Sequence, residues 1–242
     1  MRAIVLIVAI GSAALTWAAG DEVLLLGGLG PPANADALPS GWKPLVFKNI
    51  PATTRYSVVQ DGDAYVLRAE SRAAASGLYR AVNLDPKVYR RLAWRWRVEN
   101  ILKEADARRK DGDDYPARIY VTFQYDPDAA TLWERTKYGT YKLLYGEYPP
   151  KAAINYIWDN RLPRGTSLDN AYTDRAKMIV VRSGPDDVGR WWSEERDLYE
   201  DYRRVFGGEP PPIAAIAVMT DTDNTGESAV AYYDRIILRS AN

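Results

Sequence analysis

An acid-rich segment near the end of the chain has residue types and a spacing that could bind a metal ion. Asp221, Asp223 and Gly226 stand at positions one, three and six of this segment. That is the pattern of the first half of a calcium-binding loop, whose short oxygen ligands surround a hard cation. The twelfth position, where such a loop has a bidentate glutamate, is Tyr232. The segment is therefore either a calcium site formed by Asp221 and Asp223 or an Asp/Asn/Gly-rich turn between two strands.

A second polar group stands in the middle of the chain. Asp113 and Asp114 precede an alternating segment whose first polar residue is Arg118. A guanidinium group beside carboxylates could bind the carboxylate or the hydroxyl groups of a ligand through paired hydrogen bonds. The alternative is an ion pair that only fixes the loop before the strand, as many Arg–Asp pairs near strand ends do.

Aromatic residues are the strongest compositional signal, with 8 Trp and 17 Tyr against only 3 Phe. Trp and Tyr can stack on polar ligands, but they also fill protein cores when their polar atoms find partners. Trp94 and Trp96 share one face of a strand, and the arginines between and after them lie on the other face. This arrangement favours a buried position for the two tryptophans and leaves an exposed sugar-binding platform as the alternative.

Tyr120 is a better surface candidate. It alternates with Ile119 and Val121, so it lies on the opposite face of its strand from these apolar residues. Together with the polar groups above and with one further tryptophan, it completes the predicted ligand-binding set of Asp114, Arg118, Tyr120, Trp158 and Asp223.

The absence of two residue types excludes several kinds of chemistry. The sequence contains no His and no Cys. It therefore cannot form a Ser–His–Asp or Cys–His triad, a His-ligated zinc site, a His-ligated haem or a disulfide. Lys and Arg together number 32, as do Asp and Glu, and no segment is basic enough to predict nucleic-acid binding.

Carboxylates remain as possible catalytic groups. Glu195 and Asp197 lie in a segment with helical spacing, and Asp201 follows one turn later. A glycosidase needs two carboxyl groups, one protonated and one ionised, about 5–9.5 Å apart. Paired acids such as Asp114, Glu195 or Asp197 could supply them. The alternative for Glu195 and Asp197 is that they lie on the solvated face of the predicted helix.

The N-terminus has the order of a secretory signal peptide. Residues 1–20 start with Arg2, continue as an apolar run and end in small residues before Asp21. The run is shorter than the ~20 residues of a membrane span, and no later segment could span a membrane. We therefore expect cleavage of residues 1–20, with an uncleaved N-terminal anchor as the alternative. We also expect a periplasmic location, a coiled leader over residues 21–40 and one domain over residues 41–242.

Short aromatic and β-branched segments separated by Gly, Asp and Pro predict a mainly β fold. The predicted strands are residues 42–47, 64–70, 77–82, 92–98, 117–125, 153–158, 177–182, 213–219 and 229–238. Helical segments are expected at residues 129–144 and 191–206, the second ending at Gly207-Gly208. Together these elements predict a two-layer antiparallel β-sandwich, jelly-roll-like, with two helical insertions.

Several motifs in this order resemble an exported bacterial family of unknown function, DUF3047, over about residues 40 to 240. They are Trp94-Arg95-Trp96-Arg97-Val98, Asp113-Asp114-Tyr115-Pro116-Ala117-Arg118, Tyr156-Ile157-Trp158, Arg182-Ser183-Gly184, Glu195-Arg196-Asp197, Asp201-Tyr202, Phe206-Gly207 and residues 220–225. The resemblance implies no activity. The last strand, with Tyr232-Tyr233-Asp234-Arg235-Ile236, is also similar to that of jelly-roll carbohydrate-binding modules, which is a likeness of fold only.

Three functional hypotheses follow. The first is a non-catalytic periplasmic domain that binds an envelope glycan or another polyhydroxylated ligand through the five residues named above. The second is a glycan-active enzyme that uses paired carboxylates. The third is an envelope scaffold, for which exposed aromatic side chains should form a patch of several hundred Å².

Overall fold

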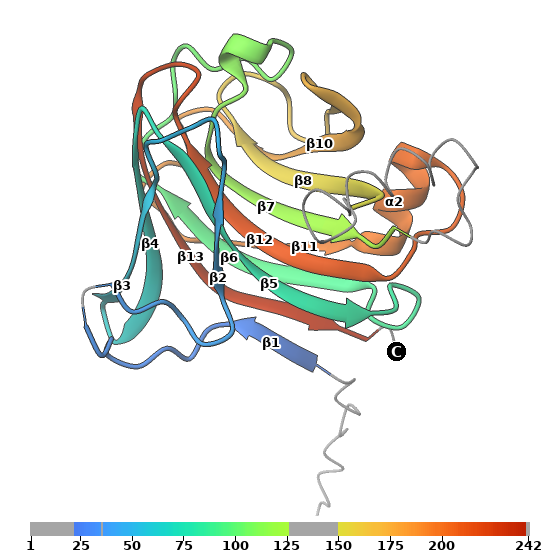
Figure 1. Cartoon of the computed structure of the whole chain (residues 1–242), viewed down its shortest axis with the longest axis horizontal. Coiled ribbons are helices and arrows are strands. Elements are labelled where there is room, and N and C mark those ends of the chain that lie inside the picture. The colour runs from blue at the N-terminus through green and yellow to red at the C-terminus, as the bar shows by residue number, and fades with distance from the viewer. Residues whose placement is uncertain (1–21, 35, 126–149, 241–242) are drawn as a thin grey trace, which may run out of the picture.

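The described residues of the computed structural model, which are 22–34, 36–125 and 150–240, form two β-sheets with a shared apolar core between them (Figure 1). The first sheet has the order β11-β6-β13-β4-β3, and β1 also pairs with β13. Its strands are β1 (Glu22–Leu26), β3 (Arg55–Asp61), β4 (Ala64–Arg72), β6 (Arg91–Val98), β11 (Trp192–Asp197) and β13 (Ser228–Arg239).

The second sheet has seven strands in the order β2-β5-β12-β7-β8-β10-β9. They are β2 (Lys43–Val46), β5 (Ala75–Leu84), β7 (Tyr115–Phe123), β8 (Ala152–Asp159), β9 (Ser167–Asn170), β10 (Thr173–Ser183) and β12 (Ile213–Asp221). Figure 1 shows β5, β12, β7 and β8 lying side by side across this sheet. The mainly β, two-sheet architecture expected from the sequence is confirmed.

One pair of strands departs from the expected antiparallel arrangement, because β10 runs parallel to β8. The short strand β9 lies between them in sequence but at the edge of the sheet, where it pairs antiparallel with β10. The chain therefore reverses direction twice before it returns beside β8. Two reversals give a parallel pair.

The structure also differs from the prediction of two helical insertions. The first, residues 129–144, lies outside the described residues. The second is half right, because Trp192–Asp197 forms strand β11 and only Leu198–Phe206 forms helix α2. Besides α2, the described residues contain the 3-10 turn η1 (Lys110–Gly112).

The boundary between β11 and α2 has a local cause. The carboxylate of Asp197 accepts the backbone N–H of Glu200 at 3.1 Å and so caps the first turn of α2. Before this cap, every residue of β11 pairs with β6, which extends the first sheet by one edge strand. The helix ends as expected at Gly207, whose backbone N–H donates to the carbonyl of Arg203.

Part of the predicted coiled leader also belongs to the sheet. Glu22–Leu26 pairs with β13 as β1, and the side chains of Leu25 and Leu26 are buried. Burial of this apolar run against the first sheet stabilises a strand where the Gly- and Pro-rich residues that follow predict coil. No helix in the described part of the chain combines the length and the apolar character that a membrane crossing requires.

The core between the sheets is rich in aromatic side chains. Trp94 and Trp96 are 1% and 0% exposed, and their rings meet edge to face at 5.4 Å. Trp94 also stacks on Tyr156 of the second sheet at 5.3 Å. The two tryptophans therefore join the sheets, which confirms the core interpretation of this pair over the exposed platform.

Candidate functional site

A cavity of about 390 Å³ opens on the outer face of the seven-stranded sheet, where β12 ends and β7 begins. It is lined by polar and aromatic residues of five strands and of the loops beside them. The lining comprises Phe47, Ile50, Ala75, Asp113, Arg118, Tyr120, Asn155, Asn170, Tyr172, Thr173, Ala176, Met219, Asp221, Asp223 and Asn224.

Strand register explains why the floor of this cavity is polar. Arg118 lies opposite Met219 across the β7–β12 pair, and Asp221 is two residues further along the same face of β12. Tyr120 lies opposite Asn155 across the β7–β8 pair. Since side chains two residues apart share a face, these five residues form one continuous patch. The alternate residues of β7 point into the core.

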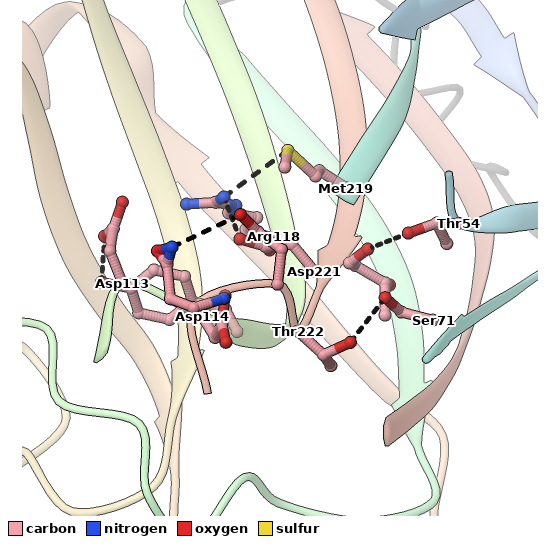
Figure 2. A network of polar contacts seen from close by, with 12 residues as sticks. Thr54, Ser71, Asp113, Asp114, Arg118, Met219, Asp221 and Thr222 are labelled. Carbon is pink, nitrogen blue, oxygen red and sulfur yellow. Dashed lines mark hydrogen bonds and ion pairs between the residues drawn. The ribbon is translucent and has the colours of Figure 1, made fainter. Parts of the chain in front are cut away.

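Arg118 and Asp221 form a buried ion pair at the centre of the floor (Figure 2). Their side chains are 4% and 1% exposed, and Nη2 of Arg118 donates to Oδ2 of Asp221. The guanidinium group lies 4.9 Å from the ring of Tyr115 and 5.1 Å from the ring of Tyr120. Two aromatic rings and one carboxylate therefore fix the position of the guanidinium.

Several polar atoms of the floor lack a hydrogen-bond partner. Nε and Nη1 of Arg118, Oδ1 of Asp221 and Oδ1 of Asn155 are buried, and no atom of the described residues satisfies them. Unsatisfied buried polar atoms are rare and destabilising, because each has lost its hydrogen bonds to water. Two donors and two acceptors without a partner therefore belong to three residues that line the same cavity.

Hydrogen bonds on the inner face of β12 hold the floor of the cavity in place. Thr220, which is fully buried, donates its hydroxyl to the carbonyl of Pro116 at 2.9 Å. Ser71 and Thr222 share a hydrogen bond of 2.8 Å on the same side, as Figure 2 shows. The end of β12 is therefore fixed from beneath while Asp221 points outward.

Two carboxylates hold the loops at the rim. Asp114 accepts the backbone N–H groups of Asn224 at 3.3 Å and Thr225 at 2.7 Å, which ties the turn after β12 to the start of β7. Asp113 accepts the hydroxyl of Tyr115 at 3.0 Å and the side-chain amide of Asn170. The acidic residues before β7 therefore fix loops, but through hydroxyl, amide and backbone N–H groups, whereas the ion pair of Arg118 is formed with Asp221.

The charges of the site are unevenly balanced. Burial raises the pKa of Asp221 well above its ordinary value, and Asp114, Asp113 and Asp223 raise it further, whereas Arg118 opposes the shift. Burial and the neighbouring Asp114 also raise the pKa of Asp223. Burial is the main cause of both shifts, and the repulsion between neighbouring carboxylates adds to it.

Tyr172 forms part of the rim from the turn between β9 and β10. It is 56% exposed, and its hydroxyl donates to the backbone carbonyl of Lys110 at 2.8 Å. This bond holds an exposed ring beside the cavity in one orientation. A ring held in this way can stack on the apolar face of a ligand with little loss of side-chain entropy.

Four of the five predicted ligand-binding residues are brought together. Arg118, Tyr120 and Asp223 line the cavity, and Asp114 holds its rim. Trp158 is the exception. It is 0% exposed, its ring lies 5.8 Å from that of Trp96, and its indole N–H donates to the carbonyl of Gly184. It packs in the core because every residue of β8 is buried, so it offers no surface for stacking.

The acids predicted near α2 lie elsewhere. Glu195 is on β11 and pairs with Arg239 at 3.2 Å. Asp197 caps α2 and pairs with Arg90 at 2.9 Å. Both acids therefore pair with basic groups, but they lie on strand β11 and not on the solvated helix face considered above.

Most residues of the cavity were not found from the sequence, among them Asn155, Asn170 and Tyr172. Asn155 had a signal in the sequence. Apart from the tyrosine that follows it, it is the only polar residue in the apolar segment 152–157. Asn170 and Tyr172 had none, because their place depends on β9 folding back along the sheet edge. Turn residues carry little periodic information.

A larger hollow of about 590 Å³ lies beside β1 and β13. Among its polar side chains, Arg95 and Asp234 pair with each other at 3.4 Å. Its lining therefore resembles ordinary protein surface, whereas the cavity above β7 and β12 contains unpaired buried groups. The smaller cavity is the better candidate.

The sequence profile of the family described as "Protein of unknown function (DUF3047)" matches residues 40–237. The chain belongs to this family. The resemblance expected from the motifs is thereby confirmed, and the three strands of the cavity floor, β7, β8 and β12, lie within the DUF3047 region. No curated protein sequence matches the chain.

Solved structures similar to this DUF3047 protein include carbohydrate-binding modules, as the sequence suggested. The family 11 module of the cellulase Lic26A-Cel5E of Clostridium thermocellum has a TM-score of 0.47 at 10% identity, covering 92% of this chain and 96% of that one. The family 30 module of Cel9D-Cel44B from the same organism has a TM-score of 0.43 at 10% identity, covering 91% and 99%.

A third similar structure is the K1 adhesin domain of Lys-gingipain from Porphyromonas gingivalis W83. Its TM-score is 0.40 at 9% identity, covering 92% of this chain and 100% of that one. These three likenesses concern the fold, and the chemistry of the cavity stands on its own residues.

Proposed function

We propose that this protein binds a neutral polyhydroxylated ligand, a glycan or a polyol, in the cavity above β7 and β12, without catalysing its reaction. The unsatisfied buried atoms of Arg118, Asp221 and Asn155 carry this proposal. A hydroxyl group both donates and accepts a hydrogen bond. Neighbouring hydroxyls of one ligand can therefore satisfy the two donors of Arg118 and the two acceptor oxygens together.

Charge and shape support the same class of ligand. The acids around Arg118 outnumber the cations, so an anionic ligand would be repelled. The rings of Tyr120 and Tyr172 border the cavity and can pack against the C–H faces of a sugar. A polyhydroxylated ring combines the polar edges and the apolar faces that such a lining recognises.

A glycan hydrolase is the second candidate, because carboxylate oxygens of Asp114, Asp221 and Asp223 lie within 4.8 Å of one another. Retaining glycosidases place their two carboxyl groups about 5–5.5 Å apart. Here, however, Asp221 is held by Arg118 and Asp114 accepts two backbone N–H groups. Since only Asp223 is left to react, binding explains the arrangement better than hydrolysis.

The scaffold hypothesis has less support from the described surface. Its large exposed apolar side chains are Leu24 on β1, Val46 on β2, Val88 between β5 and β6, and Tyr172 between β9 and β10, so they come from four separate parts of the chain. The proposal also keeps the periplasmic location, which rests on the signal-like order of residues 1–20.

Calorimetric titration of the purified full-length chain with neutral, amino-sugar-containing and uronic-acid-containing oligosaccharides and with linear polyols tests this function. We expect saturable binding of a neutral member and weaker binding of acidic ones. Assay of reducing ends in the same mixtures separates the two candidates, since their release would favour the hydrolase. Tryptophan fluorescence is a poorer readout here, because none of the residues lining the cavity in the described part of the chain is a tryptophan.

Tyr172→Ala should weaken binding of the neutral ligand by about two- to tenfold, which corresponds to about 0.5–1.5 kcal/mol of stacking. The free energy of unfolding should change little, because the ring is more than half exposed. The matched control is Tyr172→Phe, which keeps the ring and loses its hydrogen bond to Lys110. Equal affinity of Tyr172→Ala and the wild type would remove Tyr172 from the site.

A further inference from the structure

Three carboxylates from separate parts of the chain meet at the rim of the cavity. Asp114 precedes β7, Asp221 ends β12 and Asp223 lies in the turn after β12. Each offers an oxygen that lies within 4.8 Å of the others. Like charges at this distance repel one another strongly when water is partly excluded.

The neighbouring residues do not neutralise this charge. Counting Asp113, four carboxylates face one guanidinium group, that of Arg118, among the described residues that line or hold the cavity. Lys110, which precedes Asp113 in the chain, places its ammonium group over the ring of Tyr172 at 5.5 Å. More carboxylates than cationic groups at one rim favour a cation as a partner.

Asp221 supplies an independent observation. Its side chain is 1% exposed, and its Oδ2 pairs with Arg118 while its Oδ1 has no hydrogen-bond partner among the described residues. A buried carboxylate oxygen that lacks any donor is costly. Because Asp221 belongs to the acidic cluster, a cation bound there would satisfy this oxygen.

We propose that Asp114, Asp221 and Asp223 bind one Ca²⁺ ion at the rim of the cavity. The donors are carboxylate oxygens, which suit a hard cation, and Ca²⁺ accepts six to eight oxygens in irregular geometry. Mg²⁺ requires near-octahedral geometry and therefore binds less well to a site of irregular geometry. Water or ligand hydroxyls complete the coordination.

This site differs from the loop pattern seen in the sequence. That pattern requires a glutamate where Tyr232 stands, and Tyr232 lies on β13. Asp114, more than a hundred residues earlier, takes the place of the missing acid because it is tied to Asn224 and Thr225. The site therefore depends on the fold, and it does not require that the protein bind a glycan.

The test is calorimetric titration of the chelator-treated full-length protein with Ca²⁺ in the absence of any sugar, with Tb³⁺ luminescence excited through Tyr115 and Tyr172 as a second readout. We expect one bound ion and a higher melting temperature with Ca²⁺. Asp223→Asn should weaken Ca²⁺ binding by about tenfold or more. The exposed Asp186→Asn is the matched control and should bind as the wild type does.

A fold defect in the variant is distinguished by melting both proteins in chelator. There Asp223→Asn should melt at the same temperature as the wild type or higher, because it removes one repelling charge. The proposal would be overturned if the protein bound no Ca²⁺, or if Asp223→Asn bound Ca²⁺ as tightly as the wild type. It would also be overturned if the protein bound Mg²⁺ as tightly as Ca²⁺. Since no sugar is present, these outcomes are separate from those that test glycan binding.

Discussion

Replacing Arg118 with methionine is expected to lower the free energy of unfolding by about 3–5 kcal/mol, because it leaves the carboxylate of Asp221 buried without its cation. Asp221 is 1% exposed and has no other side-chain donor to its Oδ2 among the described residues. Chemical unfolding at neutral pH measures the loss. Binding of the neutral ligand should be abolished in whatever fraction remains folded, since both unsatisfied donors are removed.

The double variant Arg118→Met, Asp221→Leu separates stability from binding. An apolar pair of similar volume commonly replaces a buried ion pair without loss of stability. We expect the double variant to recover most of the lost free energy of unfolding and still to bind no ligand. If it bound normally, the buried pair would be a structural feature only.

Trp158→Ala is expected to lower the free energy of unfolding by about 3–5 kcal/mol, the range found when a buried tryptophan or phenylalanine is truncated. Trp158 is fully buried beside Trp96, and its indole N–H bonds to Gly184. Thermal or chemical unfolding measures the effect. Ligand affinity per folded molecule should be unchanged, because the ring does not line the cavity.

The milder Trp158→Phe serves if the alanine variant does not fold. It should cost less stability than truncation and leave ligand affinity at the wild-type value. A selective loss of affinity with normal stability in either variant would instead support the sequence-based prediction that Trp158 contacts the ligand.

Local pattern was sufficient for most of the sheets. Nine predicted strands correspond to strands of the structure, because apolar and aromatic alternation between Gly, Asp and Pro reflects burial on one face. Besides β11, the strands missed from the sequence are β1, β3 and β9. β9 has four residues, all half-buried or exposed, and β1 lies next to a glycine- and proline-rich segment.

Strand β11 was mistaken for helix for a different reason. Trp191 and Leu198 are seven residues apart, a spacing that fits a helix, yet the chain changes from strand to helix between them at Asp197. Pairing with β6 decides the first half, and tertiary pairing of this kind is not visible in local spacing.

The candidate site was predictable only in part. Arg118 and Tyr120 were found because their face of β7 is opposite to the core. Asp114, Asp221 and Asp223 stood out as acids beside strands, but their convergence depends on the register of β7 against β12. Trp158 was misplaced because an aromatic ring in a strand buried on both faces has the same local pattern as one on a surface.

Asn155→Leu tests the central claim most directly, since it removes one unsatisfied buried acceptor and keeps a side chain of similar size. We expect the free energy of unfolding to stay constant or to rise by about 1 kcal/mol, while calorimetry shows at least about a tenfold loss of affinity for the neutral ligand. Thr122→Val, on the same sheet face but outside the cavity, loses a 3.3 Å hydrogen bond to the carbonyl of Ala215, so it should lower the free energy of unfolding slightly and leave ligand affinity unchanged. Unchanged affinity of Asn155→Leu would contradict the account.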